Sequence, residues 1–510
     1  MLAQAANDFV GPPIDWWGVT PLLVLLGGGL LLLVAAALTP HWPRGWYALA
    51  TVTTASAALV LSIFIWDDIS DGGDRFLIAE SLRIDRFTMF ITITICAAVA
   101  LAALLTDDFL RREGAEGPEV YGLYLMCAIG GVVMAAANDL VVLFLGLETL
   151  SIALYVLAAS NRKRAESQES GLKYFILGSF SSAFLLYGIA LVYGATGTTH
   201  LTSSPAGELS IFSALESTVF LGNTKTLLLA GIALLLVGLS FKIAAVPFHT
   251  WTPDVYQGAP TPVTAFMASA AKVAGFAALL RVLTYGLSSR VDDWRPVIWV
   301  IAVITLVVGS TLAVIQTNVK RMLAYSSISH AGFILVGVEA ANERGVSGSL
   351  FYLLTYGVLV LGTFGVVTLV GRTGDAAHDL DSYRGFGRQR PILAFALTVF
   401  LLAQAGVPLT SGFVAKFAVI AAAADADSFV LAVIAMLSAV IAAFLYLRII
   451  VSMFLADPET VDAGREPVRI PVSAGLAIAI AFGFTLLVGF WPGWLLDLAE
   501  DAVPRLGLAG

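Results

Sequence analysis

Residues 241–260 read FKIAAVPFHTWTPDVYQGAP, and this stretch interrupts an apolar run, 226–246, that is long enough to cross a membrane. Proline removes a backbone donor and clashes with the preceding helical turn. Pro247 and Pro253 therefore predict that the helix unwinds after Lys242. Unwound backbone at membrane depth is tolerated only where protein or water satisfies its polar groups. The stretch thus predicts a broken transmembrane helix beside a hydrated cavity.

A second interruption follows later in the chain. Residues 401–417 read LLAQAGVPLTSGFVAKF, where Gly406 and Pro408 divide the apolar run 391–421 and Lys416 follows the break. Interrupted helices in corresponding positions of two halves are the sequence sign of an inverted-repeat transporter. Two helices broken only for packing are the alternative. Polar residues near both breaks favour hydrated cavities: His249, Thr250, Thr252, Asp254, Thr410 and Ser411.

Composition places the whole chain in a membrane. It has 510 residues, of which 58% are hydrophobic and only 13% are charged, against about 25% charged in soluble domains. The net charge of −8 and the lack of a basic stripe exclude a nucleic-acid binder. Cys96 and Cys127 lie in apolar segments without a CxxC pattern or a neighbouring His. We interpret both as buried structural thiols and predict no iron–sulfur or zinc centre.

Fourteen apolar runs approach the length of about 20 residues that a transmembrane helix needs. The longest connection, 196–225, leaves no room for a soluble catalytic domain. We therefore predict an all-α polytopic membrane protein with a single membrane domain over 1–510. The runs are 19–38, 46–66, 86–105, 120–137, 139–159, 171–195, 226–246, 261–284, 295–314, 322–338, 348–370, 391–421, 428–455 and 470–492.

Lys and Arg are unequally divided between the alternating loops. One set of loops holds fourteen of them, from Arg44 to Arg469, and the opposite set, from Arg75 to Arg505, holds nine. Loops rich in Lys and Arg face the cytoplasm. An even number of helices then predicts that both termini are extracytoplasmic. The N-terminal residues resemble neither a signal peptide nor a transit peptide, so we interpret the chain as a bacterial membrane protein.

Four charges lie where lipid-facing residues would be apolar. Glu148, Lys242, Lys272 and Lys416 fall inside apolar runs, and each central charge costs roughly 2.5–3.5 kcal/mol. The four together cost about 10–14 kcal/mol, which neutral packing would not explain. We therefore interpret them as functional. Structural ion pairing, or a lysine that reaches the membrane interface, is the alternative.

Four further polar residues carry a weaker signal. Lys173 follows the polar loop NRKRAESQES (161–170), so local ion pairing competes with a functional role. Arg448 is interpreted as a structural or interfacial arginine. His330, in the stretch YSSISHAGFILVG, is either a hydrogen-bonded structural histidine or a proton relay. His249, at the first break, is a further candidate for proton transfer.

The chain has no motif through which it could draw chemical energy. It contains no GxxxxGK[ST] loop, no GxGxxG that enters a helix after a strand, no CxxCH and no nucleophile elbow. Its own chemistry is therefore proton or ion transfer. The energy must come from an ion gradient or from a partner.

Four stretches resemble one known family, the antiporter-like membrane subunits of respiratory complex I and of multisubunit cation/proton antiporters. The stretches are LFLGLETLSIALYVL, ESGLKYFILGSFSSAFLLYG, GLSFKIAAVPFHTWTPDVYQGAPTPVTAF with SAAKVAGF, and AGVPLTSGFVAKF. The resemblance runs from about Tyr121 to Tyr446. The run LKYFILGS, and Lys rather than Glu in GFVAKF, look most like the subunit N branch of bacterial NADH-quinone oxidoreductases.

The resemblance implies a role for each charged residue. Glu148 and Lys242 would form a charge pair that controls a half-channel, Lys272 would be the central relay, Lys416 the terminal one and Lys173 an accessory site. It also implies two inverted repeats of five helices, near 120–284 and 295–455, in which the seventh and twelfth helices are broken.

The resemblance further implies the partners of the chain. They would be other membrane subunits of complex I, both antiporter-like and small, and the peripheral redox arm. NADH, flavin, iron–sulfur clusters and quinone would be bound in partner subunits, and this chain would hold no cofactor. It would translocate protons across the bacterial plasma membrane, driven by quinone reduction elsewhere in the complex.

Two rival interpretations come from other functional classes. A subunit of a separate cation/proton antiporter would use the same lysines, and a structural subunit would fill a membrane arm without pumping. Association with flavin and iron–sulfur subunits would distinguish complex I from the antiporter. Proton flux after substitution of the lysines would distinguish a pump from a scaffold.

Overall fold

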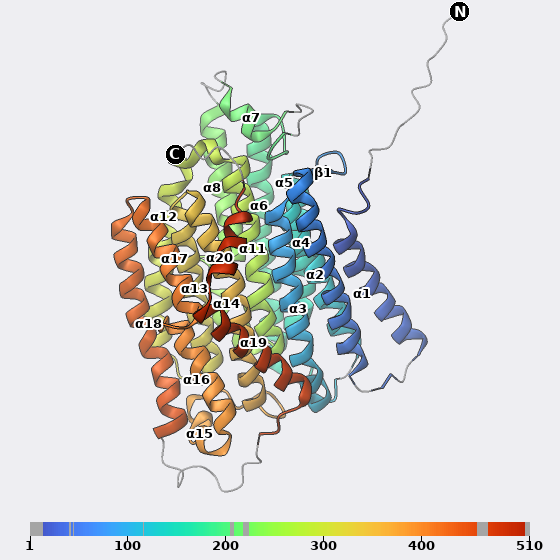
Figure 1. Ribbon diagram of the computed structural model, residues 1–510, viewed down its shortest axis with the longest axis vertical. Helices are drawn as coiled ribbons and strands as arrows, with labels where there is room; N and C mark the ends of the chain where they lie inside the picture. Colours follow the sequence, from blue (N-terminus) through green and yellow to red (C-terminus); the bar gives the residue numbers. More distant parts are fainter. Residues whose placement is uncertain are drawn as a thin grey trace, which may run out of the picture.

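The chain folds into a bundle of long helices whose axes run roughly along one direction (Figure 1). The computed structural model describes residues 14–39, 42–43, 45–115, 117–203, 209–217, 224–455 and 468–504. Within these residues, 13 helical segments are long and apolar enough to cross a membrane. They are α1 (Thr20–Leu38), α2 (Trp46–Gly72), α3 (Arg86–Glu113), α4 (Glu119–Ala136), α5 (Leu140–Ala158), α6 (Ala165–Thr196), α8 (Thr224–Lys242), the segment Thr261–Gly286, α12 (Val291–Val314), α13 (Val319–Glu339), α14 (Glu343–Val370), α18 (Phe429–Leu455) and α19 (Val472–Phe490).

Both predicted helix breaks are present. α8 ends at Lys242, and the short helix α9 (Trp251–Gly258) follows before the next spanning segment begins. The second break separates α16 (Pro391–Ala405) from α17 (Ser411–Asp425). Each of these two helices is shorter than a membrane span. Together they cover the predicted apolar run 391–421, which brings the described spanning segments from 13 to the predicted fourteen.

The segment Thr261–Gly286 is continuous but irregular. It consists of α10 (Thr261–Phe266), a π-helical stretch η2 (Met267–Ala271), α11 (Lys272–Leu280) and a second π-helical stretch η3 (Arg281–Gly286). π-Helical turns are rare and often mark functional sites. Lys272 begins α11 directly after the first of them.

Several short elements were not predicted. Strand β1 (Arg75–Leu77) pairs antiparallel with β2 (Leu82–Ile84) to form a small hairpin beside α3. Their apolar runs are too short for a periodic signal. The other short helical elements are α7 (Ile211–Glu216), η4 (Ser288–Arg290), η5 (Leu380–Tyr383), α15 (Phe386–Gln389) and α20 (Gly493–Asp501).

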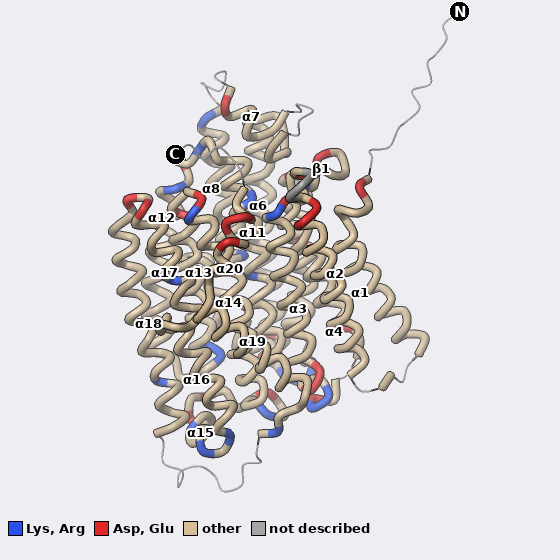
Figure 2. Tube along the Cα trace, in the orientation of Figure 1, with Lys and Arg blue, Asp and Glu red and all other residues tan. Residues whose placement is uncertain are grey.

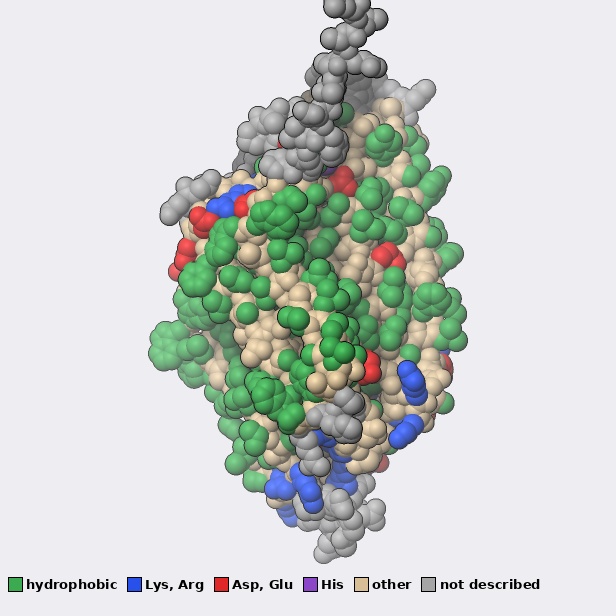
Figure 3. Space-filling model, turned by 90° about the vertical axis from the view of Figure 1, so that its right-hand side faces the viewer, with side chains coloured by type: hydrophobic (Ala, Val, Ile, Leu, Met, Phe, Trp, Pro, Cys, Tyr) green, Lys and Arg blue, Asp and Glu red, His purple; other side chains and the backbone are tan. Residues whose placement is uncertain are grey.

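The most buried helices form the centre of the bundle. The segment Thr261–Gly286 is wholly buried, and α13 and α14 are nearly so. The outer helices α1 and α18 expose large apolar side chains such as Leu31 and Val440. Figure 3 shows hydrophobic side chains over the middle of one outer face, with Lys and Arg at its lower end. This distribution suits a protein whose outer middle surface contacts lipid or another membrane subunit.

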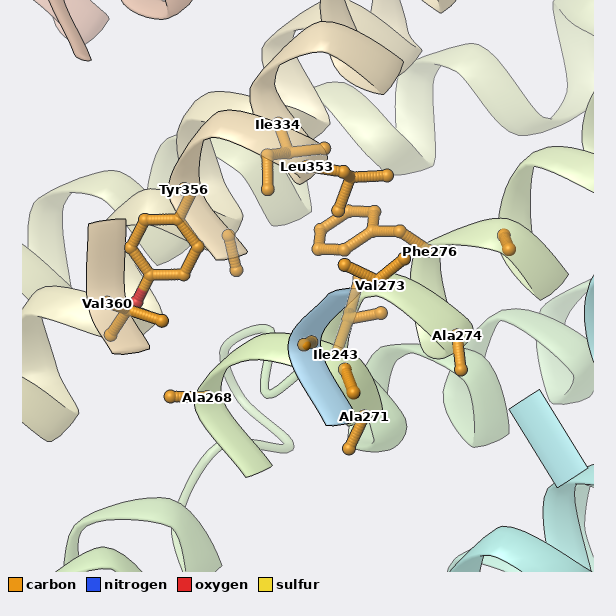
Figure 4. Packing of buried hydrophobic residues seen from close by; sticks show 14 of the residues in the cluster. Ile243, Ala268, Ala271, Val273, Ala274, Phe276, Ile334, Leu353, Tyr356 and Val360 are labelled. Carbon is orange, nitrogen blue, oxygen red and sulfur yellow. The ribbon is translucent and has the colours of Figure 1, made fainter. Parts of the chain in front are cut away.

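Apolar side chains pack the interior between the central helices. In Figure 4, Val273 and Phe276 of α11 lie beside Ile334 of α13 and Leu353 of α14. These four residues are buried and belong to one continuous hydrophobic core. The core therefore holds α11, which carries Lys272, firmly against α13 and α14.

Charged residues gather at the two ends of the bundle (Figure 2). Lys and Arg are prominent at the lower end, around α15, and acidic residues are prominent at the upper end, around β1 and α20. Three of the residues used for the topology prediction, Arg44, Arg465 and Arg505, lie outside the described residues, as do both termini.

Candidate functional site

The first buried lysine terminates the helix that the sequence predicts to break. Lys242 is the last residue of α8 and is only 6% exposed. Its Nζ donates a hydrogen bond to Ser151 Oγ of α5 at 2.8 Å and lies 5.8 Å from the ring centre of Tyr174 of α6. Lys242 is thus held by a neutral hydroxyl and an aromatic face.

Glu148 lies on α5 one helical turn from Ser151, and it is half-buried where Lys242 is buried. It accepts a hydrogen bond from the Ser182 hydroxyl of α6. No ion pair within 4.0 Å joins Glu148 to Lys242 in the described structure. The carboxylate nevertheless acts electrostatically on the lysine. Each of the two side chains that the resemblance pairs is therefore hydrogen-bonded to a serine hydroxyl instead of to the other.

A small cavity lies beside Lys242. Ser151, Ser181, Ser182 and Lys242 line it, together with apolar residues of α5, α6 and α8. The cavity has a volume of 10 Å³, which is enough for about one water molecule. One ordered water could therefore bridge the hydroxyls to the ammonium group.

The second buried lysine, Lys272, is 3% exposed at the start of α11. Its Nζ donates to Ser327 Oγ of α13 at 2.7 Å and also to the Ser327 backbone oxygen. The ring centre of Tyr356 of α14 lies 5.9 Å from the same nitrogen. Like Lys242, this lysine is held by neutral oxygens and an aromatic ring.

The third buried lysine, Lys416, faces the end of a broken helix. Its Nζ donates to the backbone oxygens of Gln404 at 2.7 Å and Ala405 at 2.9 Å, which are the last two residues of α16. The last carbonyls of a helix have no intrahelical partner and carry its negative dipole end. Gly406 follows in a left-handed conformation, with φ of 92°, and ends α16 in front of the ammonium group. The break thus creates the site that holds Lys416.

His330 lies in a hydrogen-bonded chain of side chains that leads towards Lys416. Its Nδ1 is 2.7 Å from the Tyr352 hydroxyl and its Nε2 is 3.2 Å from the Tyr446 hydroxyl. The Tyr446 hydroxyl is 2.6 Å from Ser326 Oγ, which in turn donates to Gln404 Oε1 at 3.3 Å. The side chain of Gln404 thus ends a chain of hydrogen bonds from His330, and the backbone oxygen of the same residue accepts from Lys416.

Tyr356 links the two parts of this arrangement. Its ring lies beside Lys272 and stacks on His330, with ring centres 4.5 Å apart. Tyr352, Tyr356 and Tyr446 were not predicted as site residues. On apolar helices, a tyrosine has the same sequence pattern as an ordinary core residue. Only the contacts of α13 with α14 and α18 bring them together.

Two predicted site residues lie away from this interior path. Lys173 of α6 is 42% exposed and pairs with Glu169 at 2.7 Å and Asp254 at 2.8 Å. Asp254 also pairs with Arg321 at 2.6 Å. His249 is half-buried in the first break, and its Nδ1 is buried without a hydrogen-bond partner in the described structure. These contacts do not connect either residue to the buried lysines.

Arg448 has the structural role that the sequence analysis favours. Its Nη1 donates to the backbone oxygens of Val314 at 2.9 Å and Gln316 at 2.8 Å, and it therefore caps the end of α12. Cys96 and Cys127 are buried free thiols, as predicted. Among the residues that the structure describes, no group of three or more His, Cys, Asp or Glu could hold a metal ion.

Residues 137–442 match the family described as NADH:quinone oxidoreductase/Mrp antiporter, TM. The protein named NADH-quinone oxidoreductase subunit N of Trichlorobacter lovleyi is 44% identical, over 83% of this chain and 85% of the relative. The chain belongs to the NADH-quinone oxidoreductase subunit N family. The protein named NADH-quinone oxidoreductase subunit N 3 of Streptomyces griseus is 42% identical, over 98% of this chain and 96% of the relative.

Solved structures agree with this family membership. A chain of the respiratory complex I of Thermus thermophilus with bound Aureothin superposes with a TM-score of 0.76 at 32% identity, and covers 94% of this chain and 99% of its own. A chain of the Mrp complex of Dietzia sp. has a TM-score of 0.81 at 22% identity, over 96% of each chain. The second likeness is one of fold. The recognised family and the all-α polytopic fold are both confirmed.

Proposed function

We propose that this chain is a membrane-arm subunit of a proton-translocating NADH:quinone oxidoreductase and that it carries protons on Lys242, Lys272 and Lys416. The observation that carries the proposal is their shared environment. Each is at most 6% exposed and donates hydrogen bonds to neutral oxygens. Burial without a paired carboxylate favours the neutral amine over the ammonium ion. A lysine in such a place can bind and release a proton.

Glu148 acts as the switch for the first lysine. At about 4 Å and an effective dielectric constant near 20, a carboxylate and an ammonium group attract by roughly 4 kcal/mol. Moving one charge against 150–200 mV costs about 3.5–4.6 kcal/mol. Closing or opening the Glu148–Lys242 pair therefore changes the proton affinity of Lys242 by an amount comparable to the work of pumping.

Protons then move from the first lysine towards the third. Lys272 would pass its proton towards His330, and the hydroxyls of Tyr446 and Ser326 would carry it on. Water would complete the step to Lys416, because the amide oxygen of Gln404 accepts a proton donor but has no proton to release. Hydroxyl and imidazole groups both donate and accept, so a chain of them can conduct a proton. Lys173 serves as an accessory site and His249 as a group of the hydrated first break.

The chain works inside a larger assembly. Its partners are the antiporter-like and small membrane subunits of complex I and the peripheral redox arm, where NADH, flavin, iron–sulfur clusters and quinone are bound. Quinone reduction there supplies the energy. The two inverted repeats, near 120–284 and 295–455, form one membrane domain over 1–510 with a half-channel in each.

The assembly lies in the bacterial plasma membrane. Loops at the lower end of Figure 2, where Lys and Arg are prominent, face the cytoplasm, and both termini are extracytoplasmic. A protease-sensitive tag after Gly510 should then be cleaved in intact spheroplasts. Cleavage only after permeabilisation would reverse this orientation.

Four variants test the switch: Glu148→Gln, Glu148→Asp, Lys242→Ala and the double variant Glu148→Gln/Lys242→Ala. We expect NADH-driven turnover and proton uptake in membrane vesicles to fall sharply in Glu148→Gln and in Lys242→Ala. Glu148→Asp keeps the charge and should retain part of the activity. If the two residues act as one unit, the double variant loses much less than the sum of the single losses. Near-normal pumping in Glu148→Gln, or additive losses, would refute the switch.

A further inference from the structure

Two hollows of the molecule meet at Tyr155. The first is a groove of 950 Å³ between the ends of α3 and α5 and the starts of α4 and α6. Its lining includes apolar side chains such as Ile152 and Leu172, and a polar end formed by Asn161, Arg162 and Lys163. The second is the small cavity beside Lys242, and Tyr155 lines both hollows.

Tyr155 lies on the face of α5 that carries the first charged site. Glu148, Ser151 and Tyr155 are spaced by three and four residues, which places them along one side of the helix. The tyrosine hydroxyl interacts with Ser151 and experiences the charge of Glu148. Ser151 is the acceptor of the hydrogen bond from Lys242. The Tyr155 hydroxyl is therefore next to the group that holds the lysine.

The side chain of Tyr155 is clamped between two aromatic rings and a glycine. It is 8% exposed, and the rings of Tyr174 and Phe175 lie edge to face with it at 4.8 and 5.7 Å. A Cβ atom added to Gly178 of α6 would be 2.0 Å from the tyrosine oxygen. A side chain at position 178 would thus displace the hydroxyl. The missing side chain is what allows the tyrosine to reach across to the cavity.

The polar end of the groove lies just beyond the end of α5 at Ala158. Tyr155 lines the same groove as Asn161, Arg162 and Lys163. Water that enters at this loop can therefore reach the ring of Tyr155 along the groove. The other side of the ring already faces the cavity at Lys242.

We propose that the hydroxyl of Tyr155 carries protons from the polar end of the groove to Lys242. The proposal rests on the proton-translocating function proposed above. In one transfer the tyrosine oxygen accepts a proton from water in the groove while its own hydroxyl proton leaves towards the oxygen of Ser151 or a cavity water. Ser151, or the cavity water, in turn releases its own O–H proton to the neutral amine of Lys242. At each oxygen one O–H bond forms and one breaks, so the tyrosine and the serine stay neutral and the amine gains the proton.

Tyr155→Phe tests the proposal because it removes the hydroxyl and keeps the ring. We expect proton uptake per assembled complex in NADH-energised vesicles to fall about tenfold or more, since a positioned proton-transfer group is worth at least that much. Tyr187→Phe is the matched control, because Tyr187 is on α6 and is 60% exposed. The control should pump normally.

Gly178→Ala tests the same hydroxyl without removing it. The added methyl group should displace the hydroxyl and lower proton uptake, whereas Gly194→Ala on the same helix should not, because its Cβ would meet only Leu227 at 3.2 Å. The added Cβ would also lie 2.7 and 3.0 Å from two ring carbons of Tyr155, so the methyl group displaces the ring together with its hydroxyl. Equal proton uptake in Gly178→Ala and Gly194→Ala would overturn the proposal.

Lys242→Ala in the same assay separates the two proposals. Loss of pumping in Lys242→Ala with normal pumping in Tyr155→Phe would overturn the role of the tyrosine and leave the lysine relay intact. Normal pumping in both variants would overturn the relay itself. If the Tyr155→Phe variant fails to assemble, the comparison of Gly178→Ala with Gly194→Ala tests the proposal. Equal proton uptake in those two variants would also refute the role of the tyrosine.

Discussion

Charges buried at the two ends of the bundle differ in one respect from those buried in its middle. At the upper end, Arg281 donates to both oxygens of Asp85, at 2.6 and 2.9 Å. At the lower end, Asp375 accepts from Lys320 and Arg164, each at 3.3 Å. The lysines in the middle donate to hydroxyls and backbone carbonyls and, in the described structure, have no carboxylate within 4.0 Å.

This difference separates charges that are fixed from charges that can change. Burial raises the pKa of the Asp85 carboxyl, but the charge and hydrogen bonds of Arg281 outweigh it and hold that pKa well below its usual range. Burial and the charge of Lys320 act on Asp375 in the same opposing way, again with a lowered pKa. The carboxylates of Asp85 and Asp375 therefore keep their charge at any physiological pH. A buried ammonium group beside neutral oxygens has no such partner.

The largest expected effect comes from breaking an end pair. Asp85→Asn would leave the guanidinium of Arg281 buried without its counter-charge, which costs about 3–5 kcal/mol. The yield of assembled complex and its thermal midpoint after mild detergent extraction should both drop. Asp425→Asn is the control, because the pair of Arg344 and Asp425 is half-exposed and worth at most about 1 kcal/mol. Equal effects of the two variants would contradict the comparison.

Removal of a middle lysine should give the opposite pattern. Lys272→Met takes away a charge that has no carboxylate partner, so it leaves no uncompensated charge behind. We expect an unchanged thermal midpoint and a loss of proton uptake of about 100-fold, the lower end of what a positioned proton carrier contributes. A fall in thermal midpoint as large as that of Asp85→Asn would show that Lys272 is also a structural charge.

The pH dependence of stability tests whether the charge of Asp375 stabilises the lower end of the bundle. Because the pKa of Asp375 is lowered in the folded state, its ionisation stabilises the fold fully above the unfolded value near 3.9 and is lost as the pH falls through the lower folded value. The wild-type chain should be more stable than Asp375→Asn by about 2 kcal/mol from pH 8 to about pH 5. The gap should begin to narrow below about pH 4 and should be lost only near the lowered folded value. Thermal midpoints of the wild type and of Asp375→Asn, measured across this pH range, give the gap. A gap that stays constant below about pH 4 would contradict the stabilising role of the Asp375 charge.

The smallest effect is expected in the polar path between the second and third lysines. Tyr446→Phe removes the hydroxyl that contacts both His330 and Ser326. We expect a loss of about 1 kcal/mol in stability and a several-fold slower proton uptake, measured in the same vesicles. Tyr383→Phe is the control, because the Tyr383 hydroxyl is buried without a hydrogen-bond partner in the described residues. Equal rates in the two variants would exclude Tyr446 from the path.

Sequence patterns identified the helix breaks and the buried lysines but not the contacts of those lysines. Pro247 interrupts one helix because it lacks a backbone donor, and Gly406 ends the other in a left-handed conformation. Both effects are local and follow from the residue type. That Lys416 faces the last carbonyls of α16 also follows from the short distance along the chain. The partner of Lys272, in contrast, is Ser327, which lies 55 residues away. No periodicity in either helix indicates that contact.

The resemblance pairs Glu148 with Lys242, but in the structure Glu148 is hydrogen-bonded to Ser182 and Lys242 to Ser151. The sequence predicts which charged residues lie at a similar depth in the membrane. It does not predict which rotamers their side chains adopt. The same limit explains why Asp375, in a loop after α14, was not expected to join the starts of α6, α10 and α13.

The sequence by itself determined the membrane class, the number of spanning segments, both breaks and the set of costly charges. Those properties are local, because each helix satisfies its own backbone groups and each charge has its own cost in lipid. Only the tertiary structure decided which buried charges have a carboxylate partner. That choice depends on side chains from distant helices meeting within about 3 Å, and hydrogen bonds of that length are set by packing.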